Sequence, residues 1–209
     1  MKKLITLLLI LGFTIKAQEI KIGTQTWTTK NLDVSKFRNG EAIPLAKTNA
    51  EWKAAGENKQ PAWCYFENKT ANGTKYGKLY NWYAVNDPRG LAPSGYHVPT
   101  DAEWTILTDY LGESKAGKKM KSTIGWKNNN NYNNGTNTSG FAGLPGGSRE
   151  DHGGFKNAGW DLLAEGLWYS SSYYDGDTPW SRGLLFTSDD LSKTAFPPEN
   201  GLSVRCIKD

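Results

Sequence analysis

The chain has 209 residues and a formal charge of +4, with nine Trp, ten Tyr and 23 Gly. Removal of residues 1–17 would take away Lys2, Lys3 and Lys16 but no acid, and the charge would fall to +1. A chain so close to neutral has no bulk electrostatic attraction for nucleic acid or anionic lipid, so neither partner is expected. The aromatic and glycine content is typical of a loop-rich fold held by large flat side chains.

Residues 1–17 have the pattern of a signal peptide. Lys2 and Lys3 precede an almost wholly apolar stretch at 4–13, and Ala17 offers a small residue for cleavage. The stretch is too short to span a bilayer, so no membrane span is expected in the mature chain. The pattern predicts export to the periplasm, the outer surface or the extracellular space. The alternative is an ordinary N-terminus with a buried hydrophobic helix.

The remaining chain, 18–209, contains no internal repeat and no Pro- or Ser-rich linker, which favours one domain. Two short extended runs at 19–22 and 26–29 flank a glycine-containing turn and predict a small hairpin. Further along, helical turns are expected at 49–55 and 76–85, and a strand at 60–66.

The strongest helix signal follows Pro99. Thr100 and Glu103 have the spacing of a capping box, in which each side chain bonds the backbone N–H of the other residue. Apolar residues then recur at helical spacing and predict a buried face formed by Trp104, Leu107 and Leu111 and widened by Ile106 and Tyr110. Gly112 is expected to end this helix.

The second half of the chain is predicted to alternate between short elements and long loops. A second short helix is expected at 116–122, followed by an exposed asparagine-rich loop at 127–138. Strand-like segments lie at 140–144, 166–172, 180–187 and 202–207. The long irregular stretches between them, 145–163 and 188–200, are the kind of loop that is usually functional or firmly packed.

Cys64 and Cys206 are the two cysteines of the chain. For an exported protein we predict that they form a disulfide, which would stabilise the fold by roughly 4–5 kcal/mol in the chain-entropy model. The alternative is two buried thiols. A cysteine nucleophile is not expected, because no neighbouring group in the sequence would activate either thiol.

No catalytic or metal-binding constellation stands out. The two histidines and two cysteines are scattered without zinc-ligand spacing, and no G-x-S-x-G elbow is present. Asp175-Gly176-Asp177 is a fragment of a calcium loop that lacks the full spacing and the terminal glutamate, so we interpret it as a turn. No cofactor is expected, and calcium is the less favoured alternative.

The long loops carry the residues that we predict to contact a ligand. They combine flat rings, one guanidinium and several hydrogen-bond acceptors, which suits a sugar or a cell-surface protein. The set comprises Arg149, Asp151, His152, Trp160, Tyr173, Tyr174, Asp175, Asp177 and Trp180. The alternative is that the rings fill the core beneath irregular backbone.

Several motifs carry a resemblance that spans nearly all of 18–209. They are Ile-Gly-Thr-Gln-Thr-Trp at 22–27, Tyr-Gly-Lys-Leu-Tyr-Asn-Trp-Tyr-Ala-Val at 76–85, Gly-Tyr-His-Val-Pro-Thr-Asp-Ala-Glu-Trp at 95–104, Trp-Tyr-Ser-Ser-Ser at 168–172 and Leu-Ser-Val-Arg-Cys at 202–206. Together they resemble the Fibrobacter succinogenes major paralogous domain, a family of exported bacterial modules whose function is poorly defined.

A weaker similarity at 99–104 and in the last strand is to the formylglycine-generating sulfatase-modifying family. It implies an α+β, C-type-lectin-like fold with small curled antiparallel sheets, two main helices and long irregular loops. Enzymes of that family bind copper through a C-terminal cysteine pair, but Cys206 has no such neighbour here. Many members of the paralogous family carry a cysteine where this chain has Ala92, which leaves the partner of Cys206 open.

The sequence therefore supports two hypotheses. The first is an exported, non-enzymatic module that binds a glycan or protein ligand through its long loops. The second is a cryptic enzyme of the sulfatase-modifying-like fold that uses loop carboxylates or a metal. The two differ in their pockets, because an enzyme needs converging titratable groups whereas a module needs a shaped aromatic surface.

Overall fold

The computed structural model describes residues 18–127, 134–156 and 164–209. Three sequence predictions lie outside the described residues: the signal peptide at 1–17, the ligand contact of Trp160, and the centre of the asparagine-rich loop. Within the described ranges, no helix is both long enough and apolar enough to cross a membrane.

The strands form small sheets in which neighbouring strands are antiparallel. A four-stranded sheet has the order β1 (Glu19–Ile22), β2 (Gln25–Thr28), β11 (Ile207–Lys208) and β5 (Tyr96–His97). A three-stranded sheet has the order β10 (Leu191–Ala195), β9 (Thr178–Leu185) and β8 (Glu165–Asp175). Two strand pairs complete the set: β3 (Trp63–Cys64) with β4 (Leu79–Tyr80), and β6 (Ser148–Arg149) with β7 (Phe155–Lys156).

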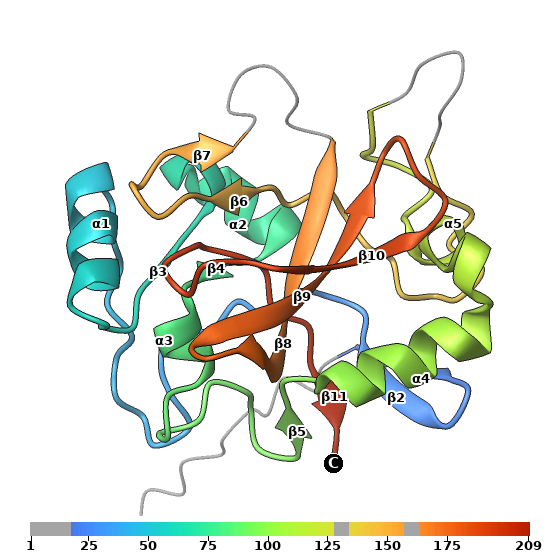
Figure 1. Cartoon of the computed structure of the whole chain (residues 1–209), viewed down its shortest axis with the longest axis horizontal. Helices are drawn as coiled ribbons and strands as arrows, with labels where there is room; N and C mark the ends of the chain where they lie inside the picture. Colours follow the sequence, from blue (N-terminus) through green and yellow to red (C-terminus); the bar gives the residue numbers. More distant parts are fainter. Residues whose placement is uncertain (1–17, 128–133, 157–163) are drawn as a thin grey trace, which may run out of the picture.

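The helices are short and lie around these sheets. They are α1 (Asn49–Glu57), α2 (Thr70–Tyr76), α3 (Trp82–Val85), α4 (Asp101–Leu111) and α5 (Ala116–Met120), with 3₁₀ turns at Phe66–Asn68 and Glu113–Lys115. Figure 1 shows β8 and β9 running through the middle of the molecule, with α1 on one side and α4 and α5 on the other. The prediction of a mixed α+β fold with small antiparallel sheets is confirmed.

Helix α4 begins where the capping box predicts. The Thr100 hydroxyl accepts a hydrogen bond from the Glu103 N–H at 3.2 Å, and the Glu103 carboxylate accepts one from the Thr100 N–H at 2.8 Å. The predicted residues Trp104, Leu107 and Leu111 are buried, and Gly112 ends the helix.

The predicted width of the α4 buried face is wrong, because Ile106 and Tyr110 are 48% and 65% exposed. At about 100° per residue Tyr110 lies roughly 100–120° around the helix from Trp104 and Leu111, and Ile106 lies roughly 140–160° away, so both fall outside the buried stripe. Ile106 and Tyr110 continue the apolar pattern of the sequence. Only a narrow stripe of α4, formed by Trp104, Leu107 and Leu111, is buried against the rest of the molecule.

The helix predicted at 76–85 is replaced by three elements, because α2 ends at Tyr76, β4 follows and α3 comes last. Gly77 has a φ of +74°, and a Cβ there would lie 2.8 Å from the Leu32 carbonyl oxygen. The chain therefore leaves the helix at this glycine. Leu79 and Tyr80 then pair with β3, and Asn81 caps α3 by accepting from the Ala84 N–H.

Among the later predictions, 166–172 and 180–187 correspond to β8 and β9. The segment 202–206 is not a regular strand. It crosses the core and makes isolated bridges from Leu202 to Tyr80 and from Ser203 to Trp168. Part of the stretch expected to be irregular, 188–200, forms the edge strand β10.

The core consists of three hydrophobic clusters. The α4 cluster stacks four rings, with centroid distances of 4.8 Å for Trp27–Trp104, 5.9 Å for Trp104–Phe141 and 5.7 Å for Phe141–Trp168. A central cluster gathers Tyr80, Trp82, Leu167, Tyr169, Val204 and Cys206, and a third joins Trp52, Ala62, Cys64, Phe66 and Leu79 under α1. Much of the aromatic content therefore fills the core under irregular backbone.

The predicted disulfide is absent, and both cysteines are free thiols. The reason is their placement, since Cys64 packs in the cluster under α1 and Cys206 packs in the central cluster. Burial raises the pKa of each thiol to about 12. Both are therefore protonated and inert near neutral pH.

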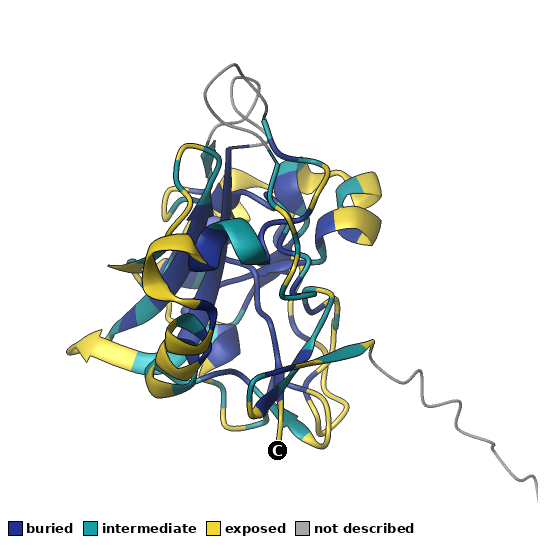
Figure 2. Cartoon of the chain, turned by 90° about the vertical axis from the view of Figure 1, so that its right-hand side faces the viewer, coloured by how far each residue is buried: buried dark blue, intermediate teal, exposed yellow. Residues whose placement is uncertain are grey.

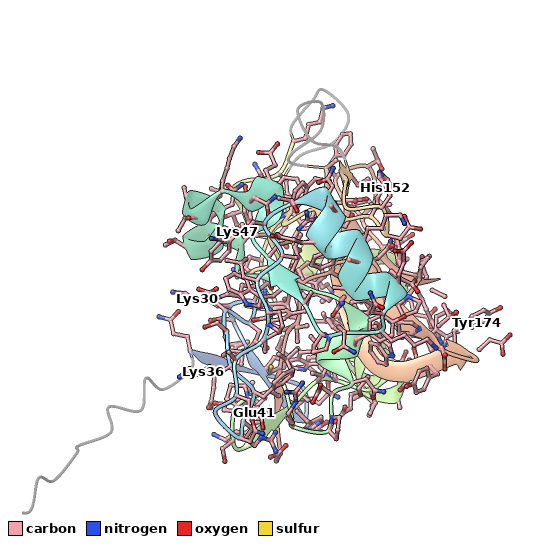
Figure 3. All side chains as sticks on the ribbon, turned by 90° about the vertical axis from the view of Figure 1, so that its left-hand side faces the viewer. Lys30, Lys36, Glu41, Lys47, His152 and Tyr174 are labelled. Atoms are coloured by element: carbon pink, nitrogen blue, oxygen red, sulfur yellow. The ribbon has the colours of Figure 1, made fainter. Side chains whose placement is uncertain are left out.

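The β8–β9 hairpin extends beyond the core. Its register shifts at irregularities between Tyr169 and Tyr173 and again before Asp175, and the residues from 173 to 177 are exposed. In Figure 2 an exposed strand end projects from the body, and Figure 3 labels Tyr174 there. The bulges twist the hairpin and carry its tip out over the neighbouring loops.

Candidate functional site

The structure separates the residues predicted to contact a ligand. Asp151 and His152 are exposed in the turn between β6 and β7. Tyr173, Tyr174, Asp175 and Asp177 are exposed at the β8–β9 tip, and Trp180 is half-buried on β9. Arg149 is buried, with an exposed fraction of 0%.

Arg149 is buried and bonded to backbone groups, which corrects the prediction that it lies on a ligand-binding surface. Its guanidinium donates to the carbonyl oxygens of Gly153 at 2.9 Å, Ala46 at 2.9 Å and Thr48 at 2.8 Å. It also stacks on the ring of Trp52 at 4.8 Å. These contacts tie the β6–β7 turn to the start of α1.

Four of the exposed members line two neighbouring hollows, whereas Tyr174 and Asp175 line neither. The first, the tip hollow, has a volume of about 270 Å³ and is lined by Lys59, Pro61, Trp82, Tyr83, Asn86, Asp87, Pro88, Tyr173 and Asp177. The second, the turn hollow, measures about 350 Å³ and is lined by Lys53, Glu57, Asp151, His152 and Glu199. In Figure 3, His152 lies near one end of α1 and Tyr174 lies beyond the other end.

One hydrogen bond joins the two hollows. The Tyr83 hydroxyl, which lines the tip hollow, donates to the Glu199 carboxylate of the turn hollow at 3.1 Å. Burial and this carboxylate raise the pKa of Tyr83 to about 12. The tyrosine is therefore a fixed hydrogen-bond donor near neutral pH.

Aromatic rings form the wall of the tip hollow. The Tyr173 ring meets the Trp82 ring edge-on at a centroid distance of 5.5 Å, and the Tyr173 hydroxyl accepts from the Asn86 amide at 2.7 Å. Trp82 is buried, and its indole N–H has no hydrogen-bond partner among the described residues. These contacts hold Tyr173 in one orientation although its side chain is 45% exposed.

Charged groups frame the same hollow. Asp177 pairs with Lys59 at 3.3 Å, which connects the hairpin tip to the end of α1. Asp87 receives two hydrogen bonds from the Arg89 guanidinium at 2.8 Å each, and these lower the pKa of its carboxyl. Both carboxylates already have cationic partners at the rim.

The other side of the hairpin tip carries a second aromatic pair. The rings of Tyr174 and Trp180 meet at 4.5 Å, and the Lys193 ammonium lies 4.0 Å from the Trp180 ring centroid. Because successive strand residues point to opposite faces, Tyr173 lines the tip hollow whereas Tyr174 does not. The predicted set of rings is therefore divided between two faces.

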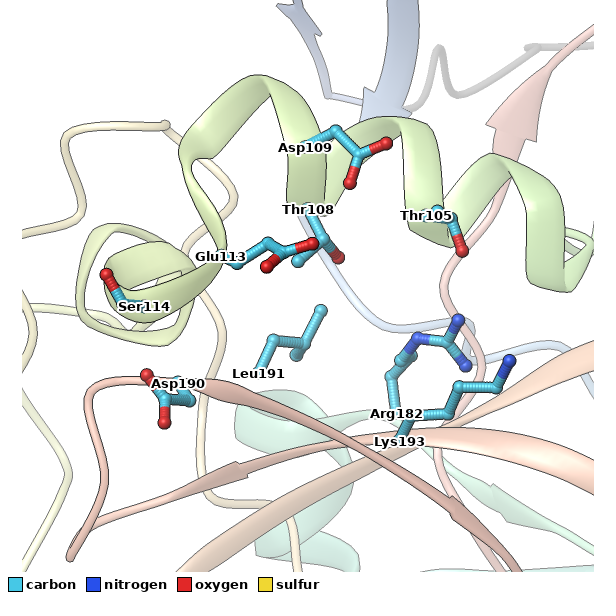
Figure 4. A pocket seen from close by; sticks show the side chains of 9 residues that line it. All are labelled: Thr105, Thr108, Asp109, Glu113, Ser114, Arg182, Asp190, Leu191 and Lys193. Atoms are coloured by element: carbon cyan, nitrogen blue, oxygen red, sulfur yellow. The ribbon is translucent and has the colours of Figure 1, made fainter.

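A third hollow, of about 450 Å³, lies between α4 and β10 and contains none of the predicted residues (Figure 4). Arg182 and Lys193 on its sheet side both bond Asp101, at 2.7 and 2.8 Å. These cations lower the pKa of the Asp101 carboxyl against the effect of its burial, which acts to raise it. The sequence does not predict the third hollow, because it forms where α4 packs against the sheet of β8, β9 and β10.

The lining of the third hollow combines two threonine hydroxyls with the carboxylates of Asp109, Glu113 and Asp190. The hydroxyls of Thr105 and Thr108 donate to helix carbonyl oxygens at 3.0 and 2.8 Å rather than to a histidine or a carboxylate. Across the described ranges, no group of three or more His, Cys, Asp or Glu side chains is placed to hold a metal ion.

His97 links separate segments of the chain through its ring nitrogens. Its ring nitrogens lie 2.8 Å from the carboxylates of both Glu103 and Asp209, which links β5 to α4 and to the end of the chain. Burial acts to lower the pKa of His97, but the hydrogen bonds to the two carboxylates raise it overall.

Comparison with known proteins identifies the family. The model of the Fibrobacter succinogenes major domain matches residues 20–208. No curated protein and no solved structure matches the chain significantly. Because the match covers nearly the whole chain, the protein belongs to the Fibrobacter succinogenes major domain family.

Proposed function

We propose that the chain is an exported, non-enzymatic module that binds a glycan in the tip hollow. One observation carries the proposal: the rings of Trp82, Tyr83 and Tyr173 converge there with the polar groups of Asn86 and Asp177. A sugar offers an apolar ring face and a rim of hydroxyls, so it suits aromatic walls with amide and carboxylate partners.

The dimensions of the hollow indicate the size of the ligand unit. Its volume of about 270 Å³ is just below the roughly 300–1,000 Å³ of pockets that enclose drug-sized ligands. A single sugar unit at the end of a chain fits this description better than an extended polymer. The turn hollow, joined through Tyr83 and Glu199, is the natural place for a second unit.

Export is part of the proposal and rests on the sequence pattern at 1–17. We expect the mature protein to begin at Gln18, which N-terminal sequencing of the secreted protein would reveal. The C-type-lectin-like arrangement is proposed with it, on the resemblance of 99–104 and the last strand to the sulfatase-modifying family.

The enzymatic alternative has less support. Lys59 pairs with Asp177 and Arg89 with Asp87, so the carboxylates of the tip hollow have cationic partners. A general acid or base needs a carboxyl or imidazole free to exchange a proton with substrate. The metal-dependent version would have to recruit ligands from residues that lie apart in the described structure.

The experiment is a glycan array followed by calorimetric titration of the best glycan. We expect Tyr173→Ala to weaken binding at least about tenfold, because hot-spot aromatic rings are worth more than about 1.4 kcal/mol. The matched control is Tyr110→Ala, which removes a 65% exposed tyrosine from α4, on a different part of the surface.

Stability and glycan binding of the two variants together test whether the tip hollow is the binding site. Both variants should remain folded, because neither ring belongs to a buried core cluster. A Tyr173→Ala variant that is folded and binds like the parent would contradict the tip hollow as the site. An array without any bound glycan would contradict the ligand class and leave a cell-surface protein as the partner to search for.

A further inference from the structure

A fourth hollow, of about 560 Å³, lies apart from those described above. It is lined by cationic Lys30, Lys75 and Arg205, by apolar Ile124 and Leu144, and by Ala142, with polar residues between them. We call it the basic hollow. In Figure 3, Lys30 lies at the edge of the molecule opposite Tyr174, so the basic hollow is distant from the hairpin tip.

Arg205 brings to this hollow a buried cation that has no carboxylate partner among the described residues. Its exposed fraction is 1%. The Nη1 group donates to the carbonyl oxygens of Thr28 at 2.8 Å and Phe141 at 2.7 Å, while Nε and Nη2 both donate to Asn31 Oδ1, at 3.2 and 3.0 Å. One Nη2 hydrogen is left without a partner among the described residues.

In the part of the chain that the structure describes, the hydrogen-bond partners of this guanidinium are neutral carbonyl and amide oxygens. Burial lowers the pKa of Arg205 to about 9, as expected for a cation that lacks an anion beside it. Arg182, by contrast, is paired with Asp101. Arg149 is also held by carbonyl oxygens, but it lines none of the four hollows described.

The rest of the lining increases the positive charge. Lys30 and Lys75 are exposed and make no ion pair within the described ranges. Asp33 is the one acid of the lining, and it is bonded to the buried ammonium of Lys78. Three cations thus face a hollow whose single carboxylate is already neutralised.

An apolar wall accompanies these cations. Ile124 is 70% exposed, and Leu144 is half-buried in the same lining. Between them Ala142 has a φ of +54°, which is unfavourable for a residue with a Cβ, and its N–H is held by Asn137 Oδ1 at 2.7 Å. Such strain persists where the surrounding structure imposes it, and it is frequent at binding sites.

We propose that the basic hollow binds a small organic acid, with its carboxylate among Arg205, Lys30 and Lys75 and its apolar body against Ile124 and Leu144. The carboxylate supplies the anion that the buried guanidinium lacks and accepts its remaining N–H. Charge-assisted hydrogen bonds of this kind are about twice as strong as neutral ones. The apolar body removes the exposed isoleucine from water.

The test is a set of titrations of the purified full chain with three probes: hexanoate, acetate and inorganic phosphate. Hexanoate should bind at least about tenfold more tightly than acetate, because its additional methylenes contribute about 0.8 kcal/mol each when buried. Binding should weaken with added salt, since two of the cations lie at the surface.

The decisive variant is Lys30→Gln with Lys75→Gln. Loss of two ammonium groups should weaken hexanoate binding about tenfold, at the usual 0.2–1 kcal/mol per exposed ion pair. The matched control is Lys36→Gln with Lys47→Gln, which removes the same charge from two exposed lysines outside the hollow. Ile124→Asp should also weaken hexanoate binding, by placing a negative charge at the rim.

Three results would overturn the proposal. The first is the absence of saturable binding by any probe. The second is an equal loss in the two lysine pairs, which would mean attraction to net charge without a site. The third is phosphate binding as tight as hexanoate binding, which would mean that the hollow binds anions without selecting for an apolar body. Glycan binding at the tip hollow is measured separately, so neither result depends on the other.

Discussion

At the scale of single residues, Trp104 is the clearest test of the core. It is 0% exposed and stacks with Trp27 and Phe141. Trp104→Ala should lower the free energy of unfolding by about 3–5 kcal/mol, because it removes a large ring from a closed cluster. Denaturant unfolding monitored by circular dichroism measures the change.

Ile106→Ala is the matched control for Trp104→Ala, since Ile106 lies on the exposed side of the same helix. We expect it to change the free energy of unfolding by less than about 0.5 kcal/mol. A Trp104→Ala protein that unfolds like the parent would mean that α4 is not part of the core. Trp104→Phe should cost less than Trp104→Ala, because it retains a ring and removes an indole N–H that has no partner among the described residues.

His97 is expected to make stability depend on pH. Burial acts to lower its folded pKa, but the Asp209 and Glu103 carboxylates raise it above the ordinary value for histidine. A raised folded pKa means that the protonated ring stabilises the fold below the unfolded pKa. This contribution disappears as the pH rises through the folded pKa.

The measurement for His97 is the melting temperature of the parent and of His97→Gln between about pH 5 and about pH 8. The parent should be more stable at the acidic end, and the difference between the two should shrink as the pH rises. A constant difference across that range would contradict the role assigned to the ring. Glu103 remains ionised throughout, since hydrogen bonds lower its pKa against the effect of burial.

At the scale of secondary structure, the capping box decides where α4 begins. Thr100→Ala removes the hydroxyl that accepts from the Glu103 N–H and should cost roughly 1 kcal/mol. Thr105→Ala, on the exposed side of the same helix, should be neutral or slightly stabilising because alanine has the higher helix propensity. Equal losses from both substitutions would argue against a specific cap.

The elements predicted correctly are those whose signal is local. The capping box of α4 and the hairpin of β1 and β2 are specified by residues within a few positions of each other. The segment 76–85 was predicted wrongly because Leu79, Trp82 and Tyr83 are spaced as in a helix. Its pairing with β3 and the left-handed backbone at Gly77 depend on residues far along the chain.

At the scale of the whole molecule, the state of the two cysteines is testable. Cys64 and Cys206 should react slowly with alkylating reagents in the native protein, because burial raises the pKa of both thiols to about 12. After unfolding without reductant, intact-mass measurement should find both alkylated. A mass that increases only after reduction would show a disulfide and contradict the packing of the two thiols in separate clusters.

The hollows were the part that sequence could predict least. The loop sequence predicts Tyr173 and Asp177 as ligand contacts, and these two residues do share the tip hollow. Their companions Trp82 and Tyr83 come from α3, which the sequence assigns to a structural helix. Arg149 was chosen for its charge, but its guanidinium is used by three backbone carbonyl groups.

The sequence by itself determined the family, the mixed α+β class and the start of α4, since each is carried by neighbouring residues. Only the tertiary structure decided which rings are buried, that Cys64 and Cys206 lie in separate clusters, and which cations surround a hollow. The physical reason is that burial and electrostatic pairing depend on contacts between distant segments. The identity of a tryptophan or an arginine does not by itself tell whether its side chain lines a pocket or fills the core.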